Sequence, residues 1–192
     1  MPFTNLQAIN AMLTAVGETA VLTLVSGASD VTNAQTILDT ETLKVLSKGW
    51  HCNSDSGVTL NPDVNGKIAV PVDALQIDPS DDRVNYTQRN GFLWNKDKNT
   101  DVIGKPVVCD IVRSLPFESL PFPLQQRVVA QAVTRYQRAY VGSKALDEFN
   151  REELALAHGD AQDAEVGADD YNILNNADLA AQTYRLTGRR FL

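Results

Sequence analysis

The sequence is poor in the residues from which catalytic and metal sites are most often built. It has two cysteines and two histidines among 192 residues. Cys52 and Cys109 form no Cys-x-x-Cys pair, so two reduced thiols are favoured over a single disulfide. His51 and His158 are far apart, and no His-Glu-x-x-His, Gly-x-Ser-x-Gly, Walker-type loop or Gly-x-Gly-x-x-Gly occurs. We therefore expect structural roles for these residues, with no cofactor and no metal.

Long apolar runs and an excess of positive charge are also missing. No stretch approaches the roughly 20 apolar residues that span a bilayer, and the N-terminus MPFTNLQAIN has no basic region followed by an apolar run. We expect neither a cleaved export signal nor membrane insertion. The net charge is −7, with 24 acidic and 17 basic residues. Because tight nucleic-acid binding relies on Lys and Arg, this balance argues against DNA as a firmly held ligand.

Residues 1–50 show helical periodicity. Leu6, Ile9, Leu13 and Val16 recur at spacings of three and four, and Gly17 is expected to end this first helix.

A second helix is expected to begin at a capping box at Thr32–Gln35, with Ser29 and Asp30 as alternative caps. It ends near Gly49. Its predicted buried stripe comprises Ala34, Leu38 and Val45. Trp50, where the chain turns away, is predicted to close the base of the helical core.

Residues 51–116 change to short strand-like runs separated by turn residues, which predicts an inserted β-rich region. The runs are GVTL, KIAV, ALQID, RVNYTQR, FLWN and VVCDIVR. Asn90-Gly91 predicts a two-residue hairpin of type I′. The resulting cross-strand pairs are Thr87 with Trp94 and Arg89 with Phe92.

Residues 117–172 return to helix. Helical spacing from Phe122 to Tyr140 is followed, after Gly142, by a strongly acidic helix from Ala145 to about Ala168. The first of these helices carries the basic residues Arg127, Arg135 and Arg138. Because a tight turn joins two helices of opposite charge, they are expected to lie antiparallel with their charges complementary. The predicted fold is α+β: an antiparallel helical bundle from the N- and C-terminal segments, an inserted small β-sheet region, and an extended C-terminal arm at 173–192.

Two acidic stretches are weak candidates for chemistry. Asn53-x-Asp55-x-Gly57 resembles part of a calcium loop but lacks the remaining ligands and the closing glutamate. The stretch Asp78-Pro79-Ser80-Asp81-Asp82 holds carboxylates of the kind that pair in glycoside hydrolysis. Turns are the favoured interpretation of both.

Several segments together resemble the tail tubular protein A family of short-tailed bacteriophages. They are AINAMLTAVGE, TNAQTILDTETLKVLSKGWHCN, GVTLNPDVNGKIAVPVDAL, VNYTQRNGFLWNKDKNT, VTRYQRAYVGS and DDYNILNN. The resemblance runs in order from about residue 6 to 176. Cys52 stands where an aromatic residue is expected, and the tail beyond Asn176 matches only loosely.

The resemblance implies a structural virion protein and not an enzyme. Family members are adaptors, or head-to-tail connectors, that form a ring of twelve copies below the portal protein and above the tail nozzle, tail tubular protein B. Genomic DNA passes through the ring without sequence-specific binding. The chain would be made in the cytoplasm of the bacterial host and would reside in the virion tail. On this view Asp55, Asp63 and Asp73 belong to turns and strand ends of a ring-building domain.

Two other classes stay open. One is a tail-associated glycan or peptidoglycan hydrolase that uses paired carboxylates, and the other is a general interaction module with no role in a phage. The acidic helix 145–168 is expected to face solvent, a neighbouring subunit or the DNA channel.

The C-terminal arm is the predicted partner-binding segment, although an exposed, frayed end is the alternative. Its apolar residues would be buried on the portal or an adjacent subunit, and its arginines would face acidic groups. The residues concerned are Tyr184, Arg185, Leu186, Arg189, Arg190, Phe191 and Leu192.

Overall fold

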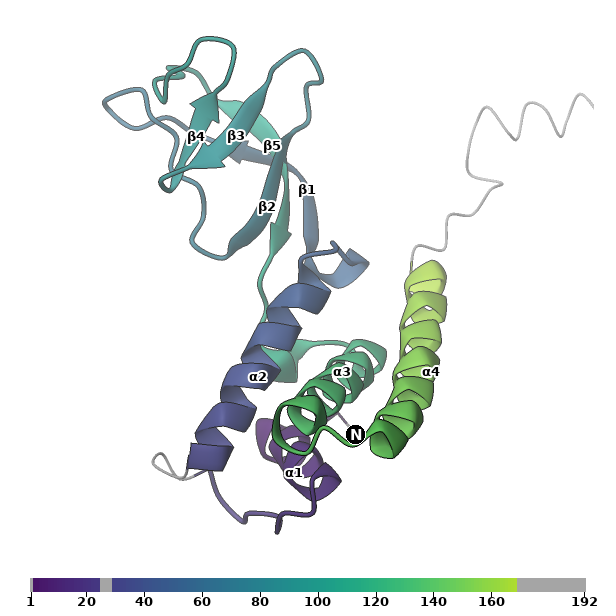
Figure 1. Cartoon of the computed structure of the whole chain (residues 1–192). Helices are drawn as coiled ribbons and strands as arrows, with labels where there is room; N and C mark the ends of the chain where they lie inside the picture. Colours follow the sequence, from purple (N-terminus) through teal and green to yellow (C-terminus); the bar gives the residue numbers. More distant parts are fainter. Residues whose placement is uncertain (1, 25–28, 169–192) are drawn as a thin grey trace, which may run out of the picture.

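The computed structural model describes residues 2–24 and 29–168, and this part of the chain has the predicted α+β composition (Figure 1). Its helices are α1 (Asn5–Ala15), α2 (Ser29–Leu46), α3 (Phe122–Tyr140) and α4 (Lys144–Ala168). Its strands are β1 (Ser54–Leu60), β2 (Ala74–Pro79), β3 (Tyr86–Arg89), β4 (Phe92–Asn95) and β5 (Val107–Arg113). Short 3-10 turns span His51–Asn53 and Phe117–Ser119. No helix within these described residues is both long and apolar enough to cross a membrane.

The boundaries of α1 follow the sequence closely. Thr4 forms a capping box with Gln7: the Thr4 hydroxyl accepts from the Gln7 N–H at 3.2 Å, and the Gln7 side chain accepts from the Thr4 N–H at 2.9 Å. After Val16, Gly17 has φ +87°, the left-handed conformation that ends helices. The predicted stop at Gly17 is confirmed.

The capping box expected at Thr32 is wrong, and the alternative start upstream, near Ser29 and Asp30, agrees better with the structure. The helix begins at Ser29, and Thr32 lies inside its first turns, where its carbonyl accepts from the Thr36 hydroxyl at 2.9 Å. Asp30 in the first turn stabilises the earlier start through its favourable interaction with the helix dipole.

The helical core is organised around α3, which packs against α1, α2 and α4. The predicted α2 stripe of Ala34, Leu38 and Val45 is fully buried there. Tyr136 of α3 is also buried, whereas Tyr140 lies at the helix end, half-exposed, with its ring 4.3 Å from that of Tyr136.

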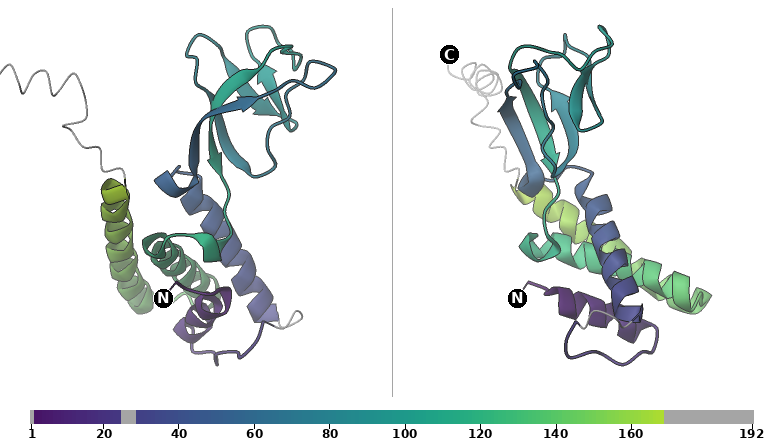
Figure 2. Two further views of the ribbon diagram at one scale, coloured as in Figure 1. Left: turned by 180° about the vertical axis from the view of Figure 1, so that it is seen from behind. Right: turned by 90° about the vertical axis from the view of Figure 1, so that its left-hand side faces the viewer.

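The strands form a three-stranded antiparallel sheet, ordered β1-β5-β2, and a separate hairpin of β3 and β4 (Figure 2). The hairpin has the predicted register, with Thr87 opposite Trp94 and Arg89 opposite Phe92. Asn90 and Gly91 both have positive φ, 52° and 78°, as a type I′ turn requires.

The run KIAV, expected as a strand, is not one. It forms only isolated bridges, Lys67 with Val102 and Ala69 with Phe92. Its apolar residues are nevertheless core residues: Ile68 and Val70 are buried with Leu93, Val107, Cys109 and Ile111. Pro71, which has no N–H to donate, directly follows the run and limits further pairing.

Two contacts show that α3 and α4 run in opposite directions. Arg138 near the end of α3 pairs with Asp147 near the start of α4. Arg127 near the start of α3 lines one hollow with His158 from the second half of α4. The expected charge complementarity between these helices holds at Arg138 alone. Arg135 instead pairs with Glu41 of α2. Within the described residues, no carboxylate forms an ion pair with Arg127.

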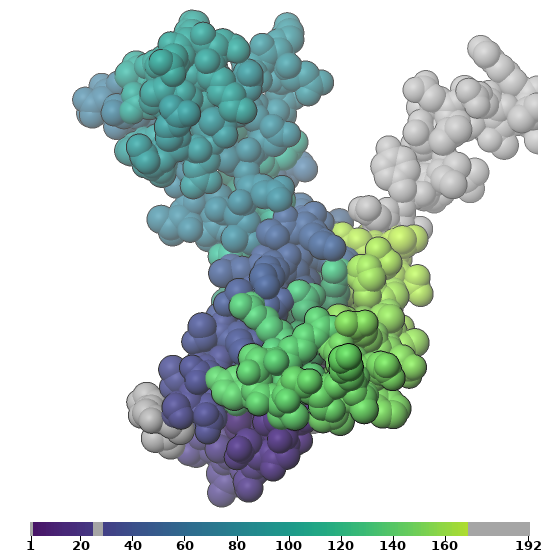
Figure 3. All heavy atoms as spheres, viewed as in Figure 1, coloured from purple at the N-terminus to yellow at the C-terminus, as the bar shows by residue number. Residues whose placement is uncertain are grey.

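Asn53 connects the helical and β parts. Its buried side chain accepts from the Trp50 N–H at 2.8 Å and donates to the carbonyls of Leu46, at 3.1 Å, and Arg113, at 2.6 Å. Figure 3 shows the two parts as lobes that meet beside the end of α2. The amide therefore fixes where the strands leave the helices.

Candidate functional site

Two of the three aspartates in the acidic stretch after α2 bind one arginine. Arg113 of β5 donates from Nε to Asp55 of β1 at 2.5 Å and from Nη1 to Asp73, just before β2, at 2.9 Å. Hydrogen bonding to Arg113 holds the pKa of Asp73 below its ordinary value. The cluster therefore joins β5 to β1 and to the residue before β2, with Asp55 of β1 held in an ion pair.

Asp63 has a different structural role. Its Oδ1 accepts from the backbone N–H groups of Lys67, at 2.8 Å, and Asn65, at 2.9 Å. Both bonds lower the pKa of Asp63, and the bond from Lys67 has the larger effect. The aspartate shapes the turn between β1 and the Ile68 segment, as predicted for a turn residue.

His51 and Cys52 lie on the short 3-10 turn that precedes β1. Desolvation and the Glu165 carboxylate raise the pKa of the Cys52 thiol, which is opposite to the shift that activates a nucleophile. Both cysteines are free thiols, and Cys109 is buried in the sheet. Within residues 2–24 and 29–168, no group of three or more His, Cys, Asp or Glu side chains could hold a metal ion.

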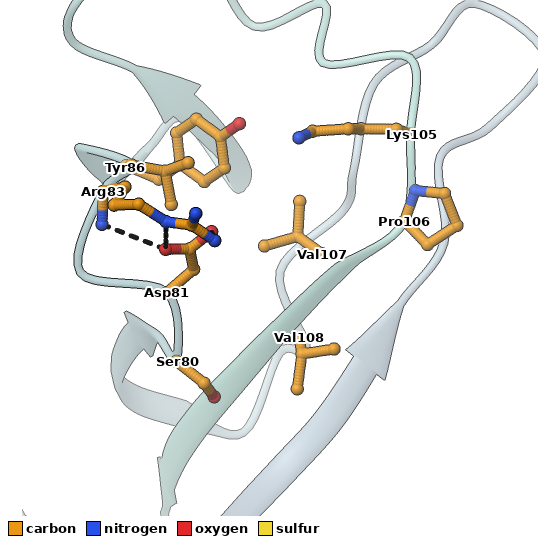
Figure 4. Close-up of a pocket in the computed structure, with 9 residues that line it drawn as sticks. Ser80, Asp81, Arg83, Tyr86, Lys105, Pro106, Val107 and Val108 are labelled. Carbon is orange, nitrogen blue, oxygen red and sulfur yellow. Dashed lines mark hydrogen bonds and ion pairs between the residues drawn. The ribbon is translucent and has the colours of Figure 1, made fainter.

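A hollow of about 460 Å³ lies beside the acidic stretch 78–82 (Figure 4). Asp81 points into it and is paired with Arg83 at 2.8 Å, below Tyr86 and Lys105. Hydrogen bonds from Arg83 lower the pKa of Asp81. A glycosidase acid needs its pKa raised, so Asp81 is shifted in the wrong direction for that role.

The structure pairs Asp78 with Asp110 of β5, which the sequence analysis had not linked to it. Both side chains are exposed, and Asp110 accepts from the Gly57 N–H at 2.8 Å and from the Ser80 hydroxyl at 3.2 Å. Asp82 is also exposed. Asp110 binds a β1 N–H and a loop hydroxyl, and all three carboxylates are exposed, whereas a general acid is typically held in an apolar pocket.

The outer face of α4 combines acidic and large apolar side chains. Phe149 is 68% exposed and Leu156 is 70% exposed. They lie seven residues apart, on one side of the helix, next to exposed acids. The neighbouring exposed acids are Glu148, Glu152, Asp160 and Asp163. The seven-residue spacing was visible in the sequence, but only the packing of α4 on α3 shows which face is left open.

The seven residues of the predicted C-terminal arm, Tyr184, Arg185, Leu186, Arg189, Arg190, Phe191 and Leu192, lie outside the described residues. Their role stays a prediction.

Comparison with known protein families gives one clear result. The family model described as tail tubular protein matches residues 6–171, which include all the helices and strands above except the start of α1. A search of curated proteins finds no match. The chain therefore belongs to the tail tubular protein family, whose members are structural components of the phage tail.

Proposed function

We propose that the chain is the adaptor of a short-tailed phage, forming a ring of twelve copies that joins the portal to the tail nozzle and lines part of the DNA ejection channel. The observation that carries the proposal is the family match across residues 6–171, through both the helical and the β part. On this proposal the chain is not an enzyme. It is made in the host cytoplasm and becomes part of the virion tail.

The surface of the chain supports an assembly role. On α4, Phe149 and Leu156 remain uncovered by any other described part of the chain. Exposed aromatic and aliphatic side chains are typical anchors of protein interfaces. The net charge of −7 per chain suits a conduit for DNA, because a strongly positive lining would hold the phosphates and slow their passage.

The decisive experiment mixes the purified chain with a portal ring. We expect a twelvefold complex by electron microscopy, and a monomer by light scattering for the chain alone at micromolar concentration, since the charge of −7 opposes self-association. A stable ring from the chain alone would contradict the second expectation. Failure to bind any portal ring would contradict the adaptor proposal.

Deleting residues 177–192 is expected to weaken docking on the portal while leaving the melting temperature of the monomer almost unchanged. The segment ends in Arg-Arg-Phe-Leu and is too short to build a core of its own, so its contacts are expected to come from a partner. The measurement is the apparent dissociation constant for the portal ring, with a melting curve as the control. If truncated and full-length chains dock equally tightly, the arm is not a partner-binding segment.

The hydrolase alternative is tested on purified peptidoglycan and capsule. We expect no release of soluble fragments, and no difference between the wild type and the Asp78→Asn or Asp81→Asn variants. Cleavage that either substitution abolishes would establish the alternative.

A further inference from the structure

Arg127 is a buried cation without an anionic partner. Its side chain lies in the helical core, with the residue only 5% exposed, and its Nη1 is buried with no hydrogen-bond acceptor. The other two arginines of α3 are about half exposed, and each pairs with a carboxylate, Arg135 with Glu41 and Arg138 with Asp147. Among the described residues, nothing anionic pairs with Arg127.

Two groups beside Arg127, the Trp50 ring and the His158 imidazole, carry no negative charge. Its guanidinium lies over the Trp50 ring at 4.9 Å, and Trp50 is itself fixed by a 2.7 Å bond from Nε1 to the Val45 carbonyl. His158 of α4 has a buried Nδ1 that also lacks a partner. Burial lowers the pKa of Arg127. The pKa of His158 is also lowered, mainly by the positive charge of Arg127 and to a smaller extent by burial and by Lys48.

These groups line a hollow of about 270 Å³ between the end of α2, α3 and α4. Lys48, Trp50, Arg127 and His158 are among its walls. Glu165 also lines it, but this carboxylate accepts from the backbone N–H of His51 at 2.5 Å. Two wall residues of the hollow, Arg127 and His158, therefore each carry a buried nitrogen without a partner among the described residues, and the one carboxylate in the wall accepts from the His51 N–H.

We propose that this hollow binds a single oxyanion, a carboxylate or a phosphate group, which pairs with Arg127 and accepts a second hydrogen bond from His158. A buried, unpaired cation is costly, and the stacking on Trp50 offsets only part of that cost. An oxyanion would satisfy the guanidinium in the bidentate geometry that arginine favours. The site is a property of the isolated chain and does not depend on the adaptor proposal.

Sulfate binding to the full chain tests the site directly. In a Trp94→Phe background, Trp50 is the only tryptophan, and its fluorescence reports on the ring that stacks on Arg127. Sodium sulfate is titrated at constant ionic strength against chloride, so that general screening is held fixed. We expect a saturable change, which Arg127→Met weakens about tenfold or more. Arg138→Met, on the same helix, is the matched control and should leave binding unchanged.

A non-saturable response, or equal binding by the wild type and Arg127→Met, would overturn the proposal. Competition then identifies the chemistry: stronger displacement by glutarate assigns the site to a carboxylate, and stronger displacement by inorganic phosphate assigns it to a phosphate. Displacement by neither also overturns it.

The melting temperature in chloride buffer without oxyanions gives an independent test. Met replaces the aliphatic part of the Arg127 side chain and removes the unpaired charge, so Arg127→Met is expected to melt at or above the wild-type temperature. Arg138→Met, which removes an exposed ion pair, sets the scale for an ordinary loss. If Arg127→Met melts lower than Arg138→Met, the charge is already compensated and the site does not exist.

Sulfate binding is expected to tighten as the pH falls from about 6.5 to about 5, because the lowered pKa of His158 places its protonation below the ordinary range. The protonated ring gains charge and a second N–H donor. The charged groups that face His158 are Arg127 from α3, Lys48 from the end of α2 and Glu165 from its own helix. Sulfate keeps its charge over this range, so the change belongs to the protein. His158→Gln should flatten the dependence, and an unchanged pH profile in that variant would remove His158 from the site.

Discussion

Replacing Trp50 with alanine is expected to lower the free energy of unfolding by about 3–5 kcal/mol, as for a large core residue. The side chain is 6% exposed and belongs to the main helical core, between the end of α2 and α3. Its indole N–H bonds to Val45, and its ring stacks against Arg127. Alanine would remove all three contributions and leave a cavity where the helices meet the β part.

The measurement is a melting curve, in which the loss corresponds to a decrease of roughly 6–20 °C for a chain of this size. Trp50→Phe keeps most of the ring but not the hydrogen bond and should cost about 1–2 kcal/mol. Trp94→Ala is the matched control: Trp94 is half-buried on the hairpin under Arg89 and should cost about 1 kcal/mol. An unchanged melting temperature for Trp50→Ala would show that the ring is not a core element.

The features predicted correctly from the sequence are those that depend on neighbouring residues. The positive φ angles of Asn90 and Gly91 are intrinsic preferences of these residues, so the hairpin and its register could be derived locally. The end of α1 at Gly17 has the same origin. Trp50 was predicted to be buried because it follows an amphipathic helix, and it is.

The features that were missed depend on contacts between distant segments. Ile68 and Val70 are residue types that favour strands, but the segment that contains them forms only isolated β-bridges with distant residues. Arg135 was expected to face α4, but α3 turns it toward Glu41 of α2. Within the described part of the chain, Arg127 is likewise unpaired because of the way the faces of α3 and α4 meet. The spacing of residues along one helix does not show which faces of two helices pack together.

The function rests on family resemblance more than on local chemistry. The acidic residues between α2 and β2 make structural contacts: Asp55 and Asp73 pair with Arg113, and Asp63 accepts turn hydrogen bonds. The predicted partner-binding residues 184–192 lie beyond the described residues.

Removing both cations beside Glu41 is expected to be the other large effect, a loss of about 3–5 kcal/mol for the double variant Lys44→Met with Arg135→Met. The Glu41 side chain is 2% exposed and accepts from Lys44 at 2.8 Å, from Gln131 at 2.5 Å and from Arg135. The bonds from Gln131 and Arg135 connect α2 to α3, whereas that from Lys44 lies within α2. Without the two cations, a buried carboxylate must either keep an uncompensated charge or take up a proton.

Two controls separate this explanation from a simple loss of contacts. Lys44→Met alone should cost no more than about 1 kcal/mol, because Lys44 is half-exposed and Arg135 remains. Adding Glu41→Gln to the double variant should recover about half of the loss or more, since the buried charge is then gone. If the triple variant is no more stable than the double variant, the charge of Glu41 is not the source of the effect.

The pH dependence of stability tests whether the two cations stabilise the charged form of Glu41. Burial alone would raise the pKa of Glu41, but hydrogen bonds from Lys44, Arg135 and Gln131 outweigh burial and lower it. A carboxyl whose pKa is lower in the folded than in the unfolded chain contributes stability above the unfolded-state pKa. This contribution is lost as the pH falls through the folded-state pKa. Between about pH 5 and pH 3, the wild type should therefore lose more stability than Glu41→Gln, as measured by urea unfolding at each pH. Equal losses would mean that the folded-state pKa of Glu41 is not lowered, and that the two cations do not stabilise its charge.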